Sequence, residues 1–174
     1  MRAIARETDI DVKAIQMQLK RLENINVLSS TLKGRNKEYS LNLNNSITNY
    51  YIMLAETFSS INYLERNFLI KKIISEVKDR IEGVIILFGS FVKGEATKES
   101  DIDMFVLTEK INKDAFTEVS NLIGREINVK STNKKEFLRG LEDSDPLIME
   151  VILNHIILKG IDDFCDIMWR YYAK

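Results

Sequence analysis

The chain is poor in the residues that build covalent or metal cross-links. Its 174 residues include one cysteine, one histidine and one proline. Cys165 alone cannot form an intramolecular disulfide, and one cysteine with one histidine does not make a Cys/His zinc site. No apolar stretch approaches the ~20 residues of a transmembrane helix, and the N-terminus lacks the apolar segment of a signal peptide. These absences predict a soluble, cytoplasmic protein with no membrane partner.

The composition is that of a folded protein with an uneven charge. Apolar residues make up 45% of the chain and charged residues 29%, with a formal net charge of -1, which suits one ordinary domain or two small ones. Residues 1–45 hold eight Lys and Arg against five Asp and Glu, whereas residues 46–174 hold seventeen against twenty-one. This asymmetry predicts a front end that meets an anion and a back end with another task.

The front end, residues 1–45, has the pattern of two helices. Residues 2–9 predict a short helix, and Asp11 is a suitable N-cap for a second helix over residues 12–28. The second helix has an apolar stripe of Val12, Ile15, Leu19 and Leu22. Its opposite face carries Lys13, Met17, Lys20 and Arg21, with Gln16 on the flank. Long cationic and amide side chains are of the kind that reach phosphates and base edges.

A β-hairpin follows these helices, because two alternating runs are joined by the sequence KGRNK. Its tip carries Lys33, Arg35 and Lys37. Helix, helix and basic hairpin resemble a winged helix-turn-helix of small bacterial and archaeal transcription regulators, which implies binding to double-stranded DNA through these cations and the helix face. A winged helix usually has one more helix in front, so the unit is expected to be incomplete or completed by a later helix. The alternative is a solvated helix face and a charged turn.

Residues 46–80 predict connecting helices, because they carry helical patterns without a Gly-, Pro- or Ser-rich linker. We expect two helices or one kinked helix, with a break at Ser59-Ser60. Packing is the favoured role, and homodimer formation through Tyr50, Tyr51 and Phe58 is the alternative. The same two roles apply to the amphipathic C-terminal helix predicted over residues 161–174.

Two apolar runs in the middle of the chain frame a polar segment. Residues 83–88 predict a buried strand that ends at Gly89-Ser90, where a short helix begins, and residues 101–107 predict a second strand. A glycine turn at a helix N-terminus is suited to phosphate. Asp101 and Asp103 alternate onto one face of their strand, where two carboxylates repel each other unless a cation lies between them. Mg²⁺, or Mn²⁺, fits that position.

Gly-Ser, ten intervening residues and Asp-x-Asp resemble the signature of the polymerase-β-like nucleotidyltransferase superfamily, in particular the minimal nucleotidyltransferases. The resemblance covers residues 81–160 and implies an α+β fold with a mixed sheet. It implies that Gly89 and Ser90 hold the triphosphate of an NTP such as ATP, and that Asp101 and Asp103 bind the divalent ions. It also implies transfer of a nucleoside monophosphate to an acceptor: a protein such as a HEPN-type toxin, a small molecule or an RNA end.

The chain departs from that family at its third catalytic position. Active members carry a third acid on the strand predicted over residues 124–130, where this chain has Asn128, which carries no charge and takes no proton. Glu126 is a candidate substitute on the same face, and Arg125 is equally compatible with a phosphate contact or a surface role. Two functions therefore stay open: an active nucleotidyltransferase with a DNA-binding front end, or a DNA-binding regulator whose degenerate domain senses a nucleotide or partner.

Overall fold

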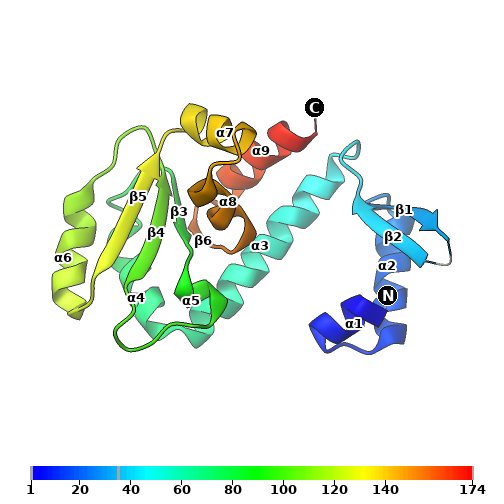
Figure 1. Cartoon of the computed structure of the whole chain (residues 1–174), viewed down its shortest axis with the longest axis horizontal. Coiled ribbons are helices and arrows are strands. Elements are labelled where there is room, and N and C mark those ends of the chain that lie inside the picture. Colours follow the sequence, from blue (N-terminus) through cyan, green and yellow to red (C-terminus); the bar gives the residue numbers. More distant parts are fainter. Residues whose placement is uncertain (1, 35, 174) are drawn as a thin grey trace. The chain divides into compact units, whose positions relative to one another are not determined.

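The computed structural model describes residues 2–34 and 36–173 (Figure 1). The chain forms two compact units, one with Met1–Ile52 and Tyr172–Lys174, the other with Met53–Tyr171. We call them the N-terminal unit and the C-terminal unit. Among the described residues, no helix has both the length and the apolar character that crossing a membrane requires.

The N-terminal unit contains two helices and a hairpin, in the predicted order. The helices are α1 (Arg2–Thr8) and α2 (Val12–Asn24), and the strands β1 (Leu28–Lys33) and β2 (Asn36–Leu41) pair antiparallel. The Asp11 carboxylate accepts hydrogen bonds from the backbone N–H groups of Lys13 and Ala14 at 2.8 and 3.2 Å, so it caps α2 as predicted. A winged helix-turn-helix remains a prediction for this unit.

The predicted apolar stripe of α2 is only partly buried. Ile15 is buried, Leu19 and Leu22 are half-buried, and Val12 is exposed. The prediction for Val12 was wrong because this residue is the first of the helix. Side chains in a helix point toward its N-terminus, so the side chain of Val12 extends past the start of α2, where no earlier turn of the helix covers it.

Two helices connect the hairpin to the sheet of the C-terminal unit. They are α3 (Ile47–Arg66) and α4 (Phe68–Val77), and they meet at Asn67. The predicted break at Ser59-Ser60 was wrong. Ser60 lies inside α3, where its buried hydroxyl donates a 2.6 Å hydrogen bond to the carbonyl of Ile157. A polar side chain with an internal partner does not interrupt a helix.

The C-terminal unit is built on a four-stranded mixed sheet, which confirms the predicted α+β class. Its strands are β3 (Val84–Leu87), β4 (Ile102–Leu107), β5 (Ile127–Thr132) and β6 (Ile156–Lys159), in the spatial order β5-β4-β3-β6. The β4–β5 pair is parallel and the other two pairs are antiparallel. The parallel pair needs a crossover, which α6 (Lys113–Ile123) supplies.

Helices cover both faces of this sheet and create two apolar clusters (Figure 1). On one face, α4 and α6 pack against residues such as Ile85, Ile102 and Met104. On the other face, Ile86 and Phe105 contact α7 (Lys134–Glu142), α8 (Pro146–Leu153) and α9 (Ile161–Tyr172). Because both faces are buried, β3 reads as a continuous apolar run.

Candidate functional site

The turn after β3 brings the backbone against a carboxylate. Gly89 has φ 74° and ψ -150°, a combination open essentially to glycine alone. A Cβ atom at this position would lie 2.5 Å from Oδ2 of Asp103. Glycine is therefore required twice here, for its backbone conformation and for the close approach of Asp103. The four-residue helix α5 (Ser90–Lys93) begins at the next residue, as predicted.

The two aspartates lie at the start of β4. The strand begins at Ile102, so Asp101 precedes it instead of opening it. Ile102 is fully buried, Asp103 is half-buried and Asp101 is exposed. The carbonyl of Asp103 accepts a 3.1 Å hydrogen bond from the N–H of Phe88, which fixes β4 beside the Gly89 turn.

Asn128 completes this group from the neighbouring strand. In the parallel register of β4 and β5, Asn128 lies opposite Asp103. Its side-chain amide donates a 3.3 Å hydrogen bond to Oδ2 of Asp101. The structure therefore brings Gly89, Asp101, Asp103 and Asn128 together at one end of the sheet. The roles predicted for them stay predictions.

The electrostatics of this group disfavour the charge on Asp103. Burial raises the pKa of Asp103 above its ordinary value, and the carboxylates of Asp101 and Glu150 raise it further. The amide of Asn128 and the ammonium of Lys130 oppose these effects without cancelling them. A carboxylate that is hard to ionise beside a second carboxylate is a place where a bound cation lowers the free energy.

The donor set fits one hard cation incompletely. The described residues contain no group of three or more acids, histidines or cysteines that could hold a metal ion. Asp101 and Asp103 supply carboxylate oxygens and Asn128 has an amide oxygen, all of the type Mg²⁺ prefers. Since Mg²⁺ is commonly held by one or two carboxylates together with substrate phosphates, this pair suits a metal that arrives with a nucleotide.

Sequence reasoning missed two charged residues near the aspartates. Lys93 of α5 and Glu150 of α8 form an ion pair with Nζ and Oε1 at 2.6 Å. The Glu150 carboxylate raises the pKa of Lys93, with a smaller contribution from Asp103. The position of Lys93 three residues after Ser90 was a usable signal for a cation facing phosphate. Nothing in the sequence signalled Glu150, which the packing of α8 brings to the site.

The residues predicted to contact DNA fall into two groups in the N-terminal unit. Lys13, Gln16, Met17, Lys20 and Arg21 are all exposed on α2. On the hairpin, Lys33 pairs with Glu38 at 2.8 Å, and Lys37 pairs with Glu23 at 2.8 Å. Arg35 lies outside the described residues.

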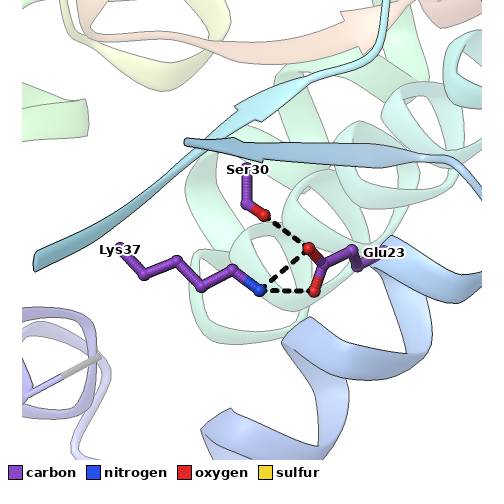
Figure 2. Close-up of polar contacts among 3 residues, drawn as sticks. All are labelled: Glu23, Ser30 and Lys37. Carbon is purple, nitrogen blue, oxygen red and sulfur yellow. Dashed lines mark hydrogen bonds and ion pairs between the residues drawn. The ribbon is translucent and has the colours of Figure 1, made fainter. Parts of the chain in front are cut away.

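The Lys37 pair belongs to a small polar cluster, which Figure 2 shows. Both carboxylate oxygens of Glu23 accept hydrogen bonds from the Lys37 ammonium, and the Ser30 hydroxyl also donates to Glu23. These contacts, with that of Lys37 first, lower the pKa of Glu23. The cluster joins α2 to the hairpin and holds the Lys37 ammonium against a carboxylate of the same unit.

Three comparisons with known proteins bear on this group. A solved structure described as "Crystal structure of the toxin-antitoxin with AMP-PNP" is 23% identical to this chain, with a TM-score of 0.41, over 59% of this chain and 82% of that chain. No curated protein matches the chain closely enough to count as a relative. The family model of the nucleotidyltransferase domain matches residues 70–159, which include most of α4, the Gly-Ser turn, all four strands of the sheet and Asn128. The chain therefore belongs to the nucleotidyltransferase domain family.

Proposed function

We propose that this protein transfers a nucleoside monophosphate from an NTP, ATP in the first instance, to an acceptor in a reaction that depends on Mg²⁺ or Mn²⁺. The observation that carries the proposal is the contact of Gly89 with the Asp103 carboxylate. A glycine turn that lies directly against a carboxylate, with Asp101 nearby, supports metal-dependent binding of a triphosphate at this point. The acceptor is a protein, a small molecule or an RNA end.

The residues of the group have separate tasks in this proposal. Gly89 and Ser90 receive the triphosphate, since a backbone without a side chain allows close approach. Asp101 and Asp103 hold the divalent ion, which when bound neutralises charge on the phosphates. Asn128 keeps Asp101 oriented through the 3.3 Å hydrogen bond. Because asparagine cannot take a proton, the acceptor is deprotonated without help from this position.

The N-terminal unit is proposed to bind double-stranded DNA through the exposed face of α2. The described residues give Lys13, Lys20 and Arg21 no ion-pair partner, whereas Lys33 and Lys37 have carboxylate partners. The helix cations are therefore the ones that can neutralise phosphates without first losing an internal contact.

A second candidate function is a DNA-binding regulator that senses a nucleotide without turning it over. Asn128 favours this second function, because a metal bound here would have one acidic ligand fewer than in active members of the family that the sequence resembles. A sensor still requires Asp101 and Asp103 for metal-dependent nucleotide binding. The two candidates therefore share the binding step and differ only in transfer.

Labelling with α-³²P-ATP separates the two functions. The protein is incubated with labelled ATP, Mg²⁺ or Mn²⁺ and cell lysate, and nucleotide binding is measured in parallel by calorimetry. Transfer of label that Asp103→Asn abolishes supports the enzyme, and metal-dependent binding without transfer supports the sensor. The control is Asp79→Asn, an exposed aspartate in the turn after α4, which should change neither. Absence of both transfer and metal-dependent binding in the unaltered protein would overturn both candidates.

A further inference from the structure

Arg125 makes contacts that bear on the two roles its sequence position left open, a phosphate contact or a surface role. It is half-buried and lies two residues before the start of β5. Its Nη2 atom donates to the carbonyl of Thr97 at 3.4 Å and to the carbonyl of Lys98. Its guanidinium carbon also lies 5.6 Å from the centroid of the Phe91 ring. One side chain thus contacts both α5 and the loop that leads to the aspartates.

The contacted loop ends at Asp101. The N–H of Thr97 donates to the hydroxyl oxygen of Ser100 at 2.8 Å, and the N–H of Ser100 donates back to the carbonyl of Thr97 at 3.3 Å. This closed turn is followed immediately by Asp101. Anchoring the Thr97 carbonyl therefore fixes the turn from which the Asp101 carboxylate projects.

The segment around Arg125 also contacts Asp101 and the residue that follows it. The N–H of Ile102 donates to the carbonyl of Glu126 at 2.9 Å, and the amide of Asn128 donates to Asp101. Arg125 itself is anchored to α6, because the hydroxyl of Ser120 donates to its carbonyl at 2.7 Å. The backbone of Arg125 is thus held in place, so its guanidinium can support the loop that it contacts.

The other contact of Arg125 reaches the phosphate-binding turn. Phe91 follows Ser90 directly in α5, and its carbonyl accepts a 3.1 Å hydrogen bond from the hydroxyl of Tyr63 in α3. Tyr63 fixes the backbone at Phe91 while Arg125 covers the ring. Arg125 is therefore the side chain that joins the two ends of the Gly-Ser to Asp-x-Asp segment.

We propose that Arg125 is a positioning residue that holds Asp101 in register with the Gly89-Ser90 turn. The inference rests on the proposed nucleotide and metal site, and it adds a residue to it. A planar guanidinium can stack on an aromatic ring while its edge donates to two carbonyls, whereas a lysine ammonium offers only a point charge. The role therefore depends on the shape of the side chain and not on its charge.

A direct contact of Arg125 with a ligand is the competing explanation. Arg125 also borders a hollow of about 400 Å³, together with Asn67, Phe91 and residues of the loop. A contact with an anionic ligand depends mainly on charge, so Arg125→Lys should preserve it. The positioning role predicts that Arg125→Lys behaves like Arg125→Gln.

The first test is ATP binding by calorimetry, with and without Mg²⁺. Both Arg125 variants should weaken Mg²⁺-dependent binding by roughly 10–100-fold, the usual effect of removing a group that orients a metal ligand, and leave metal-free binding unchanged. The controls are Arg139→Lys and Arg139→Gln, at an exposed position of α7, which should match the unaltered protein. Unaltered Mg²⁺-dependent binding by Arg125→Lys, or equal weakening without metal, would overturn the positioning role.

The second test needs no ligand and is amide hydrogen exchange. Both Arg125 variants should exchange faster at the N–H groups of Thr97, Ser100 and Ile102, while the strands β3 and β6 keep their protection. Unchanged exchange rates at the three amides would show that Arg125 does not support the loop. The variant Asp103→Asn, measured alongside, identifies failure of the proposed function. If this variant retains Mg²⁺-dependent ATP binding, the proposed metal site is wrong. The hydrogen-exchange data would still test whether Arg125 supports the loop.

Discussion

The two units of the chain differ in how they hold their polar groups. In the C-terminal unit, helices cover both faces of a sheet, and the half-buried Asp103 lies at the end of that sheet. In the N-terminal unit, Ala5, Ile15, Val27 and Thr48 are buried, and the described cations are exposed to water apart from the half-buried Lys37, which pairs with Glu23. The larger core can therefore keep the carboxylate of Asp103 partly buried, where its charged form is disfavoured. The smaller core of the N-terminal unit leaves most of its charged side chains in contact with water.

The largest expected difference between the units concerns their cores. Ile86→Ala in β3 and Ile15→Ala in α2 remove the same atoms from the two units. The fully buried Ile86 should cost about 3–5 kcal/mol of unfolding free energy, and Ile15, in the smaller core, about 2 kcal/mol or less. Denaturant unfolding measures both, because Trp169 of α9 reports on the C-terminal unit while circular dichroism reports on both units. Equal shifts would contradict the contrast in depth.

A second prediction concerns the charges displayed by the N-terminal unit. The double variant Lys20→Ala with Arg21→Ala should weaken DNA binding and lower the salt dependence of the binding constant by about 1 per lost phosphate contact. Lys37→Ala should have the smaller effect, because Lys37 already pairs with Glu23. Gel shifts across a salt series measure both. A larger effect for Lys37 would move the proposed interface from the helix to the hairpin.

The third prediction concerns the unfavourable charge in the C-terminal unit. Because the folded pKa of Asp103 is raised, its folded form binds protons more tightly, so ionisation lowers stability as pH rises through the window above the ordinary pKa. Asp103→Asn should therefore stabilise the metal-free protein at neutral pH by about 1 kcal/mol, and it should remove stabilisation by Mg²⁺ with ATP. Thermal unfolding tests this. The exposed Asp9→Asn of the N-terminal unit, the control, should change little.

The smallest expected effect concerns a histidine in the C-terminal unit. Burial lowers the pKa of His155, but the Glu56 carboxylate, 3.6 Å away, and the carbonyls of Ile152 and Val151 outweigh burial, so the pKa lies above its ordinary value. The protonated form thus stabilises the fold fully below about pH 6.5, and this contribution is lost as pH rises through the folded pKa.

The expected size of this histidine contribution is at most about 1 kcal/mol. Melting temperatures across pH 5–9 measure it, and Glu56→Gln should flatten the profile. By contrast, Glu23→Gln in the N-terminal unit removes a carboxylate that titrates at lower pH, so it should leave this pH window unchanged. A pH profile that Glu56→Gln does not change would exclude the ion pair as its source.

Local patterns in the sequence were enough for the individual strands, the hairpin and the glycine turn at Gly89, whereas the mixed sheet was implied by the family resemblance. Strand runs with apolar residues on both faces, a glycine at a turn and carboxylates two residues apart all act within a few residues, so their geometry is fixed locally. Helix breaks were less predictable. Ser60 looked like a break because its hydroxyl partner, the carbonyl of Ile157, lies far away in the sequence.

By itself, the sequence determined the two ends of the signature and the absence of an acid at position 128, since these depend on residue identity and close spacing. Only the tertiary structure decided what surrounds them. The packing of α8 brings Glu150 toward Asp103 and into contact with Lys93, and the β4–β5 register places Asn128 and Arg125 against the loop that carries Asp101. Such contacts join segments separated by tens of residues, and they arise only when burying apolar faces brings those segments together.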